Sequence, residues 1–133
     1  MELQFWDTSA VVALFAQENR SADAIRIAEA GNRFWAWDWM QMESLSALHR
    51  RKSGADRIRR LRELWRRFEY VAIDAGHFPA LEKLLQKHRL RSADAGHLLC
   101  LKWVHKLNPG IGFVCFDQEL SGAAESEGIR VLG

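Results

Sequence analysis

The sequence predicts one α/β domain over residues 1–133, built around a mainly parallel sheet of about five strands. Short apolar segments alternate with segments of helical period along the whole chain, and parallel strands require such crossover connections. No Gly-, Ser- or Pro-rich linker and no internal repeat interrupts this alternation. A length of 133 residues also suits a single domain with its own hydrophobic core.

The first elements are predicted from an apolar run and from the residues that end it. Residues 3–6 form a short apolar strand, and Asp7-Thr8-Ser9 after them favour the start of a helix. Apolar residues then recur at helical spacing over 11–15. Ser21 is the predicted N-cap of a second helix, which Gly31 ends.

The middle of the chain adds a strand, two helices and another strand. The aromatic residues of 34–37 predict a strand, and Asp38 with Gln41 resembles a capping box for a helix over 39–52. The next helix, over 55–68, has its apolar residues on one face and its arginines on the others. A strand over 70–73 follows.

The last part of the chain contains the most apolar helix. An amphipathic helix comes first, with apolar residues at positions 78, 81, 84 and 85. Ser92 is the predicted N-cap of a helix over 93–106 that is apolar almost all round, which indicates burial. A strand over 112–116, a short helix to Glu127 and a closing strand over 129–132 complete the domain.

Composition excludes several classes of protein. With 48% hydrophobic and 27% charged residues, the chain is not of the disordered type. No apolar run approaches the roughly 18 residues of a membrane span, and residues 1–4 lack the basic start of a secretory signal. Cys100 and Cys115 provide no disulfide framework and are expected to be buried, so we expect a cytoplasmic protein.

The formal net charge of +2 conceals an uneven distribution. Residues 50–67 contain nine basic and two acidic side chains, whereas the rest of the chain contains ten basic and fifteen acidic ones. Arg59, Arg62 and Arg66 share one face of the helix predicted over 55–68. Two interpretations remain open for this basic strip: contact with RNA phosphates, and a solvated helix face.

Four carboxylates occupy positions where we expect functional groups. Asp7 and Asp117 end predicted strands, and ligands of parallel sheets bind at that edge. Glu43 has mostly apolar neighbours on its helix face, and Asp94 opens the apolar helix. If the four converge, their repulsion requires a cation, and oxygen ligands favour Mg²⁺ or Mn²⁺. Such an ion suits phosphodiester hydrolysis.

Each of these carboxylates also has a purely structural interpretation. Asp7 and Asp117 are candidate N-caps for the helices that follow them. Asp94 is a favourable first-turn acid, and Glu43 is a candidate for a surface or ion-paired residue. His97, on the same helix face as Asp94, is expected to be a packed histidine that a neighbour satisfies, with a ligand or general-acid role as the alternative.

The tryptophans are also open to two interpretations. Trp35, Trp37 and Trp39 alternate along the chain beside the predicted acidic site. Packing in the core or in a dimer interface is the simpler expectation. Stacking of one of these rings on an RNA base beside the site is the alternative.

Four short motifs follow one another along the chain. They are Asp7-Thr8-Ser9-Ala10-Val11-Val12-Ala13-Leu14-Phe15, Met42-Glu43-Ser44-Leu45-Ser46-Ala47-Leu48, Arg91-Ser92-Ala93-Asp94-Ala95-Gly96-His97-Leu98 and Phe116-Asp117-Gln118-Glu119-Leu120. In this order and spacing they resemble the motifs of PIN-domain ribonucleases, and the resemblance covers essentially the whole chain. The size of the chain is similar to that of the VapC toxins of toxin–antitoxin pairs.

The resemblance implies a three-layer α/β/α sandwich and Mg²⁺- or Mn²⁺-dependent endoribonuclease activity. Asp7 and Asp94 would bind metal directly, and Glu43 and Asp117 would complete the site by holding waters or a second ion. Thr8 or Ser9 would orient Asp7. The implied partners are RNA, a small VapB-like antitoxin and a second copy of the chain, and the basic region of the family often helps to dock the antitoxin.

Two positions depart from the family pattern. Cys115 stands two residues before Asp117, where the family often has Thr or Ser, and Asp38 stands where a hydroxyl residue is more usual. An inactive RNA-binding module is the alternative if either departure disrupts the metal site. An RNA-processing nuclease without an antitoxin is a separate alternative. A phosphate-accepting receiver domain is a further alternative, but the lysines lie on predicted helices rather than at a strand end.

Overall fold

A computed structural model of the chain describes residues 2–133. Its strands are β1 (Leu3–Trp6), β2 (Arg33–Trp37), β3 (Phe68–Val71), β4 (Gly112–Val114) and β5 (Arg130–Leu132). Its helices are α1 (Thr8–Phe15), α2 (Ser21–Ala30), α3 (Met40–Arg50), α4 (Ala55–Trp65), α5 (Phe78–His88), α6 (Ser92–Leu107) and α7 (Gln118–Ser126), with a 3-10 turn η1 (Ala75–His77) before α5. Strands and helices therefore alternate as the sequence predicts.

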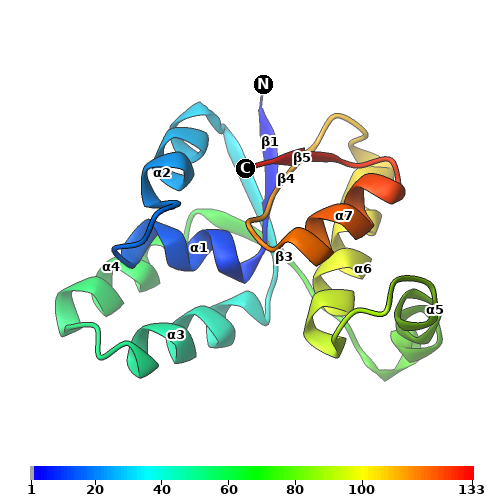
Figure 1. Ribbon diagram of the computed structural model, residues 1–133, viewed down its shortest axis with the longest axis horizontal. Helices are drawn as coiled ribbons and strands as arrows, with labels where there is room; N and C mark the ends of the chain where they lie inside the picture. The colour runs from blue at the N-terminus through cyan, green and yellow to red at the C-terminus, as the bar shows by residue number, and fades with distance from the viewer. Residues whose placement is uncertain (1) are drawn as a thin grey trace.

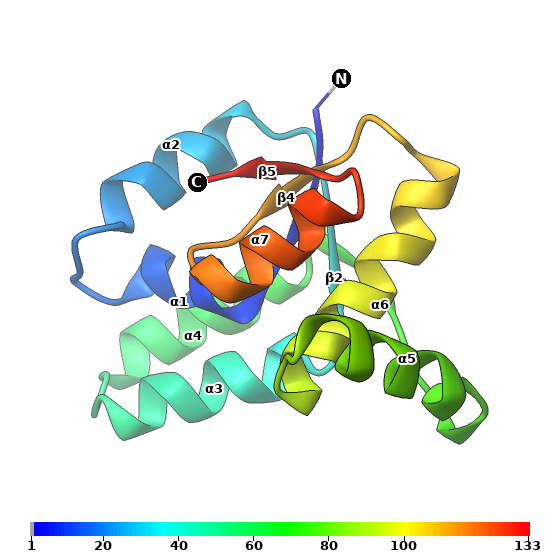
Figure 2. The same cartoon turned by 45° about the vertical axis from the view of Figure 1, so that its right-hand side comes forward.

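The strands form one parallel sheet in the order β3-β2-β1-β4-β5. Phe5 of the central strand pairs with Trp35 on one side and with Phe113 on the other. Helices α1 to α4 lie on one side of the sheet and α5 to α7 on the other (Figure 1). In Figure 2, as in Figure 1, α3 and α4 run side by side as an extended arm. The predicted three-layer α/β fold is confirmed.

Two hydrophobic cores lie on opposite faces of the sheet. Phe5 and Phe113 belong to the core beneath α5, α6 and α7, whereas Trp6 and Val114 belong to the core beneath α1 to α4. Consecutive strand residues point to opposite faces, so a strand that is covered on both faces is apolar at most positions; the exception in β1 is buried Gln4, which hydrogen-bonds to the Ile27 carbonyl and to Trp6 Nε1. This explains why the central strands appear in the sequence as continuous apolar runs.

Helix α6 is buried, as its apolar composition predicts. Eight of its residues are buried, His97 among them with 2% of its surface exposed. Within residues 2–133, none of the helices combines the length and the apolar character that a membrane crossing requires.

Several element boundaries differ from their predicted positions. The strand predicted over 70–73 lies at Phe68–Val71, because it pairs with β2 from Phe34 opposite Phe68 to Trp37 opposite Val71. The predicted strand over 112–116 ends at Val114. The helix predicted over 39–52 is shorter at both ends, and the helix predicted over 55–68 ends earlier, at Trp65. The partner strand decides which residues join the ladder, and no local sequence pattern contains that information.

Three predicted N-caps are wrong. Ser21 and Ser92 are the first residues of α2 and α6 rather than their caps, and Ser21 Oγ donates to the carbonyl of Ala16 instead. The N-cap of α3 is Trp39, which makes no side-chain cap, so the capping-box interpretation of Asp38 is also wrong. An N-cap depends on the backbone angles at that residue as well as on its type.

One partly buried carboxylate, Glu127, connects the end of α7 to α5 and α6. Glu127 accepts hydrogen bonds from Lys87 Nζ at 2.8 Å, His88 Nε2 at 2.7 Å and Lys102 Nζ at 3.0 Å. The hydrogen bond from Lys87 and the other two partners outweigh the effect of burial and lower the pKa of Glu127 to about 2. We call this group the Glu127 anchor.

Candidate active site

The carboxyl ends of β1 and β4 place Asp7 and Asp117 at one edge of the sheet. The two strands are neighbours, and the backbone N–H of Asp7 donates to the carbonyl of Val114 at 3.2 Å. Both aspartates are N-caps: Asp7 Oδ1 accepts from Ala10 N at 3.3 Å, and Asp117 Oδ1 accepts from Leu120 N at 3.0 Å. The prediction that both are N-caps is therefore confirmed. The cap uses only Oδ1 of each aspartate, so the second carboxylate oxygen, Oδ2, takes no part in it.

Asp7 is the most deeply buried of the four predicted site carboxylates. Only 4% of its surface is exposed. Burial raises the pKa of Asp7, although the charge of the nearby His97 and hydrogen bonds from Ser9 and the Ala10 backbone act in the opposite direction. Ser9 Oγ lies 2.8 Å from Asp7 Oδ1 and 3.0 Å from Oδ2. Of the two hydroxyl residues that could orient Asp7, the structure therefore selects Ser9.

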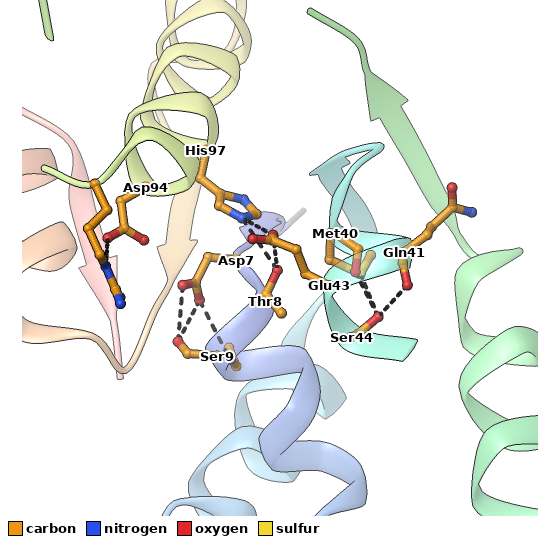
Figure 3. A network of polar contacts seen from close by, with 11 residues as sticks. Asp7, Thr8, Ser9, Met40, Gln41, Glu43, Ser44, Asp94 and His97 are labelled. Atoms are coloured by element: carbon orange, nitrogen blue, oxygen red, sulfur yellow. Dashed lines mark hydrogen bonds and ion pairs between the residues drawn. The ribbon is translucent and has the colours of Figure 1, made fainter. Parts of the chain in front are cut away.

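Glu43 is held by a hydrogen-bond network that joins three elements (Figure 3). Its Oε1 accepts from Thr8 Oγ1 of α1 at 2.7 Å and lies 2.7 Å from His97 Nε2 of α6. Burial acts to raise the pKa of Glu43, but the hydrogen bonds and charge of His97 and the hydrogen bond of Thr8 outweigh it, and the pKa falls below its usual range. The network fixes an ionised carboxylate beside Asp7.

Asp94 and Asp117 form a second, more exposed part of the same edge. Burial and the negative charge of Asp117 raise the pKa of Asp94. Arg91 opposes this effect, because its Nε lies 3.4 Å from Asp94 Oδ2 and its Nη2 lies 3.9 Å from Asp117 Oδ2. Asp94 and Asp7 point into the same region beside the Glu43 network in Figure 3.

The chemistry of this set of side chains fits a hard divalent cation. All four carboxylates are oxygen donors of the type that Mg²⁺ and Mn²⁺ prefer. Burial raises the pKa of both Asp7 and Asp94, and the charge of Asp117 raises that of Asp94 further. A bound cation would act in the opposite direction, because it stabilises the ionised form of each carboxylate. Among residues 2–133, no three His, Cys, Asp or Glu side chains are grouped closely enough to hold a metal ion. Metal ligation by Asp7, Asp94 and Asp117 therefore stays a prediction.

Comparison with protein families identifies the fold. The model of the PIN domain family matches residues 5–102 of this chain. The chain belongs to the PIN domain family. The matched part of this PIN domain contains Asp7, Glu43 and Asp94, and it ends before Asp117. No curated protein matches the chain at a significant level.

Solved structures with the same fold include proteins of toxin–antitoxin systems. VapC20 of Mycobacterium tuberculosis, a sarcin–ricin loop cleaving toxin, superposes with a TM-score of 0.72 at 20% identity, over 90% of this chain and 94% of that one. A toxin–antitoxin complex from Klebsiella pneumoniae gives 0.65 at 17% identity, over 86% and 87%. PAE2754 from Pyrobaculum aerophilum gives 0.62 at 19% identity, over 98% and 90%. At these identities the likeness establishes the fold of the PIN domain.

The arginines of the basic strip in this PIN domain differ in their surroundings. Arg59 forms ion pairs with Asp56 and Glu63 on its own helix. Arg62 and Arg66 instead line a cavity of about 480 Å³ between α3, α4 and β3, together with aromatic side chains and Gln41. Contact of the three arginines with RNA stays a prediction, and Arg62 and Arg66 are the two whose positions favour it.

Two features of the site were missed by reasoning from the sequence. Arg91 supplies the positive charge beside Asp94 and Asp117, and its position three residues before Asp94 was the available signal. His97 is packed as we expected, and its Nε2 lies 2.7 Å from Glu43, but its buried Nδ1 has no hydrogen-bond partner among residues 2–133. Its contact with Trp37, with ring centroids 5.0 Å apart, was not predicted. Gly96 beside it was the signal, because a glycine inside a helix often marks a close approach.

Proposed function

We propose that this PIN domain is a metal-dependent endoribonuclease toxin of the VapC type, which hydrolyses RNA phosphodiester bonds and is neutralised by a cognate VapB-like antitoxin. The observation that carries the proposal is the position of Asp7 and Asp117 after neighbouring strands of a PIN domain, with Asp94 near Asp117 and with Glu43 and Asp94 beside Asp7 in Figure 3. The toxin and antitoxin parts of the proposal are supported by the similarity to VapC20 and to the Klebsiella pneumoniae complex.

In this proposal the four carboxylates have different tasks. Asp7, Asp94 and Asp117 would hold Mg²⁺ or Mn²⁺, which when bound activates a water and stabilises charge on the scissile phosphate. Ser9 fixes the carboxylate plane of Asp7 through its two short contacts. Glu43 accepts hydrogen bonds from Thr8 and His97, so it is available as an ionised, oriented acceptor for a water proton.

Arg91 supports the proposal from the outer side of the site. Its side chain is 82% exposed while its guanidinium group lies near Asp94 and Asp117. An exposed arginine at this place can contact a phosphate of the substrate once the two carboxylates have another counter-charge. Arg62 and Arg66 would contact the RNA further away. The proposal also includes a homodimer and a cytoplasmic location, where RNA is available.

The experiment is cleavage of total cellular RNA by the purified, antitoxin-free protein, with mapping of the cut sites. We expect cleavage with Mg²⁺ or Mn²⁺, and none with a chelator or in the Asp7→Asn and Asp94→Asn variants. Asp23→Asn is the matched control, because Asp23 lies on α2 and pairs only with Arg20 and Arg26 among the described residues. All RNAs remaining intact with Mn²⁺ would overturn the proposal.

The same preparation separates the alternatives. RNA binding that survives chelation without any cleavage would favour an inactive RNA-binding module. Cleavage of RNA without growth arrest on expression would favour an RNA-processing nuclease, which needs no small partner protein to neutralise it. Light scattering of the purified protein measures whether it is a dimer.

A further inference from the structure

A groove runs along one face of α3, outside the four carboxylates. Its lining side chains lie at positions that recur every three or four residues, so they share one helix face: Trp39, Met42, Glu43, Ser46, Ala47 and Arg50, with Thr8 opposite. The groove has a volume of about 540 Å³. Its two ends, Trp39 and Arg50, are eleven positions apart, which corresponds to roughly 16 Å of helix. The groove is therefore long enough to bind two separate groups of one ligand, one at each end.

The groove opens directly onto the candidate active site. Glu43 and Thr8, which form its wall, are the two residues joined by the 2.7 Å hydrogen bond in the network with His97. Whatever occupies the groove must lie against Glu43. An antitoxin segment that filled the groove would cover this carboxylate and block cleavage, whereas RNA bound in it would lie beside the cleavage site, so the side chains at the two ends of the groove must decide between the two occupants.

The two ends of the groove have different chemistry. At the end where α3 begins, Trp39 is 51% exposed and Met42 is 45% exposed, which is unusual for such large apolar side chains. At the other end, Arg50 has no ion pair among residues 2–133, whereas its neighbour Arg51 pairs with Glu18 at 2.9 Å. An exposed aromatic ring and a free guanidinium group on one groove match a base and a phosphate.

We propose that this groove binds a single-stranded segment of RNA next to the cleavage site, with one unstacked base on Trp39 and Met42 and a phosphate on Arg50. The inference rests on the proposed function, because it assigns a subsite to that same active site. Double-stranded RNA is excluded from this subsite, because a paired and stacked base does not offer its face to an aromatic ring. Trp39 therefore favours an unpaired nucleotide beside the cut, whichever base it carries.

The test uses the full chain and a short single-stranded RNA that the wild-type protein cleaves. In the Trp39→Ala variant we expect kcat/KM to fall by about 5- to 150-fold, which corresponds to roughly 1–3 kcal/mol of base stacking. Trp39→Phe keeps an aromatic face and should recover most of this loss. Phe78→Ala is the matched control, because Phe78 is 60% exposed on α5 and does not line the groove.

Binding is measured separately in an Asp94→Asn background, so that no cleavage occurs. Trp39→Ala should weaken the binding of this RNA and remove the quenching of tryptophan fluorescence by the base. Arg50→Ala should weaken binding and reduce the slope of log affinity against log salt by about 1. An exposed side chain contributes little to the fold, so urea unfolding of both variants should match the wild type.

Three outcomes would overturn the inference. The first is wild-type cleavage and binding by Trp39→Ala, and the second is an equal loss in Trp39→Ala and Phe78→Ala. The third is a change of Trp39→Ala from dimer to monomer with unchanged RNA affinity, which would make this face a subunit contact. If the wild type instead cleaves no RNA, the proposed function fails, and the binding measurements still decide whether the groove takes single-stranded RNA.

Discussion

The substitution Gly96→Ala tests the packing that positions the active-site face of α6. Gly96 lies between Asp94 and His97, and a Cβ added there would stand 2.5 Å from each of two ring carbons of Trp37. Atoms at that separation overlap, so the helix or the ring must move. The ring is itself packed against His97, so it has little freedom to yield.

The magnitude follows from two opposing effects. Replacing a helical glycine by alanine stabilises a helix by about 1 kcal/mol, whereas forcing extra atoms into a packed core costs about 1–3 kcal/mol. Gly122 of α7 is the matched control, because a Cβ added there has no heavy atom within 4 Å. We expect Gly122→Ala to stabilise the protein by about 1 kcal/mol, and Gly96→Ala to be less stable than Gly122→Ala by about 1–3 kcal/mol.

Urea unfolding followed by circular dichroism measures both free energies. The slope of the free energy against urea should be the same in both variants, since neither changes the surface exposed on unfolding. RNA cleavage provides the second readout: Gly96→Ala should lose activity, because a shift of about 1 Å in a catalytic group can lower a rate about 100-fold. Gly96→Ala being as stabilising as Gly122→Ala, with full cleavage activity, would refute this reasoning.

Two further predictions concern the carboxylates of Glu127 and Asp7. The pKa of Glu127 is about 2 in the folded protein against a usual 4.5, so its stabilising contribution is complete above pH 4.5 and is lost as the pH falls toward 2. Glu127→Gln should therefore lower the free energy of unfolding by about 1–2 kcal/mol at pH 7, a value reduced by the exposure of its lysine partners. The difference between the variant and the wild type should shrink below pH 4.5. A difference in urea unfolding that does not change with pH would contradict the role of the Glu127 anchor. Asp7→Asn should raise the melting temperature in the presence of a chelator, because it removes a buried charge whose pKa burial raises and retains an N-cap residue. A lower melting temperature of Asp7→Asn would show that the carboxylate stabilises the fold.

Much of the fold could be predicted because its information is local. The run at 112–116 has no polar side chain able to form strong hydrogen bonds, and the run at 3–6 is apolar except at Gln4, and this predicts strands that are covered on both faces. The period of apolar residues over 55–68 predicts a helix in the same way. The exact ends were less predictable, since β3 occupies Phe68–Val71 only because those residues face β2.

The candidate site was predictable in its members and unpredictable in its contacts. Asp7 and Asp117 were identified from their positions after strands, and a parallel sheet necessarily brings such positions to one edge. The sequence left open whether Thr8 or Ser9 orients Asp7. In the structure Ser9 does so, while Thr8 donates to Glu43, 35 positions further along the chain.

The sequence by itself determined the order of strands and helices along the chain, the burial of α6 and the positions of Asp7 and Asp117 after strands, because each depends on residues a few positions apart. Only the tertiary structure decided that His97 holds Glu43, that Arg91 lies between Asp94 and Asp117, and that Trp39 is exposed in a groove beside the site. These contacts join α1, α3, α6 and α7. Their geometry depends on how the helices pack on the sheet, and packing is fixed by the shapes of side chains that are remote in sequence.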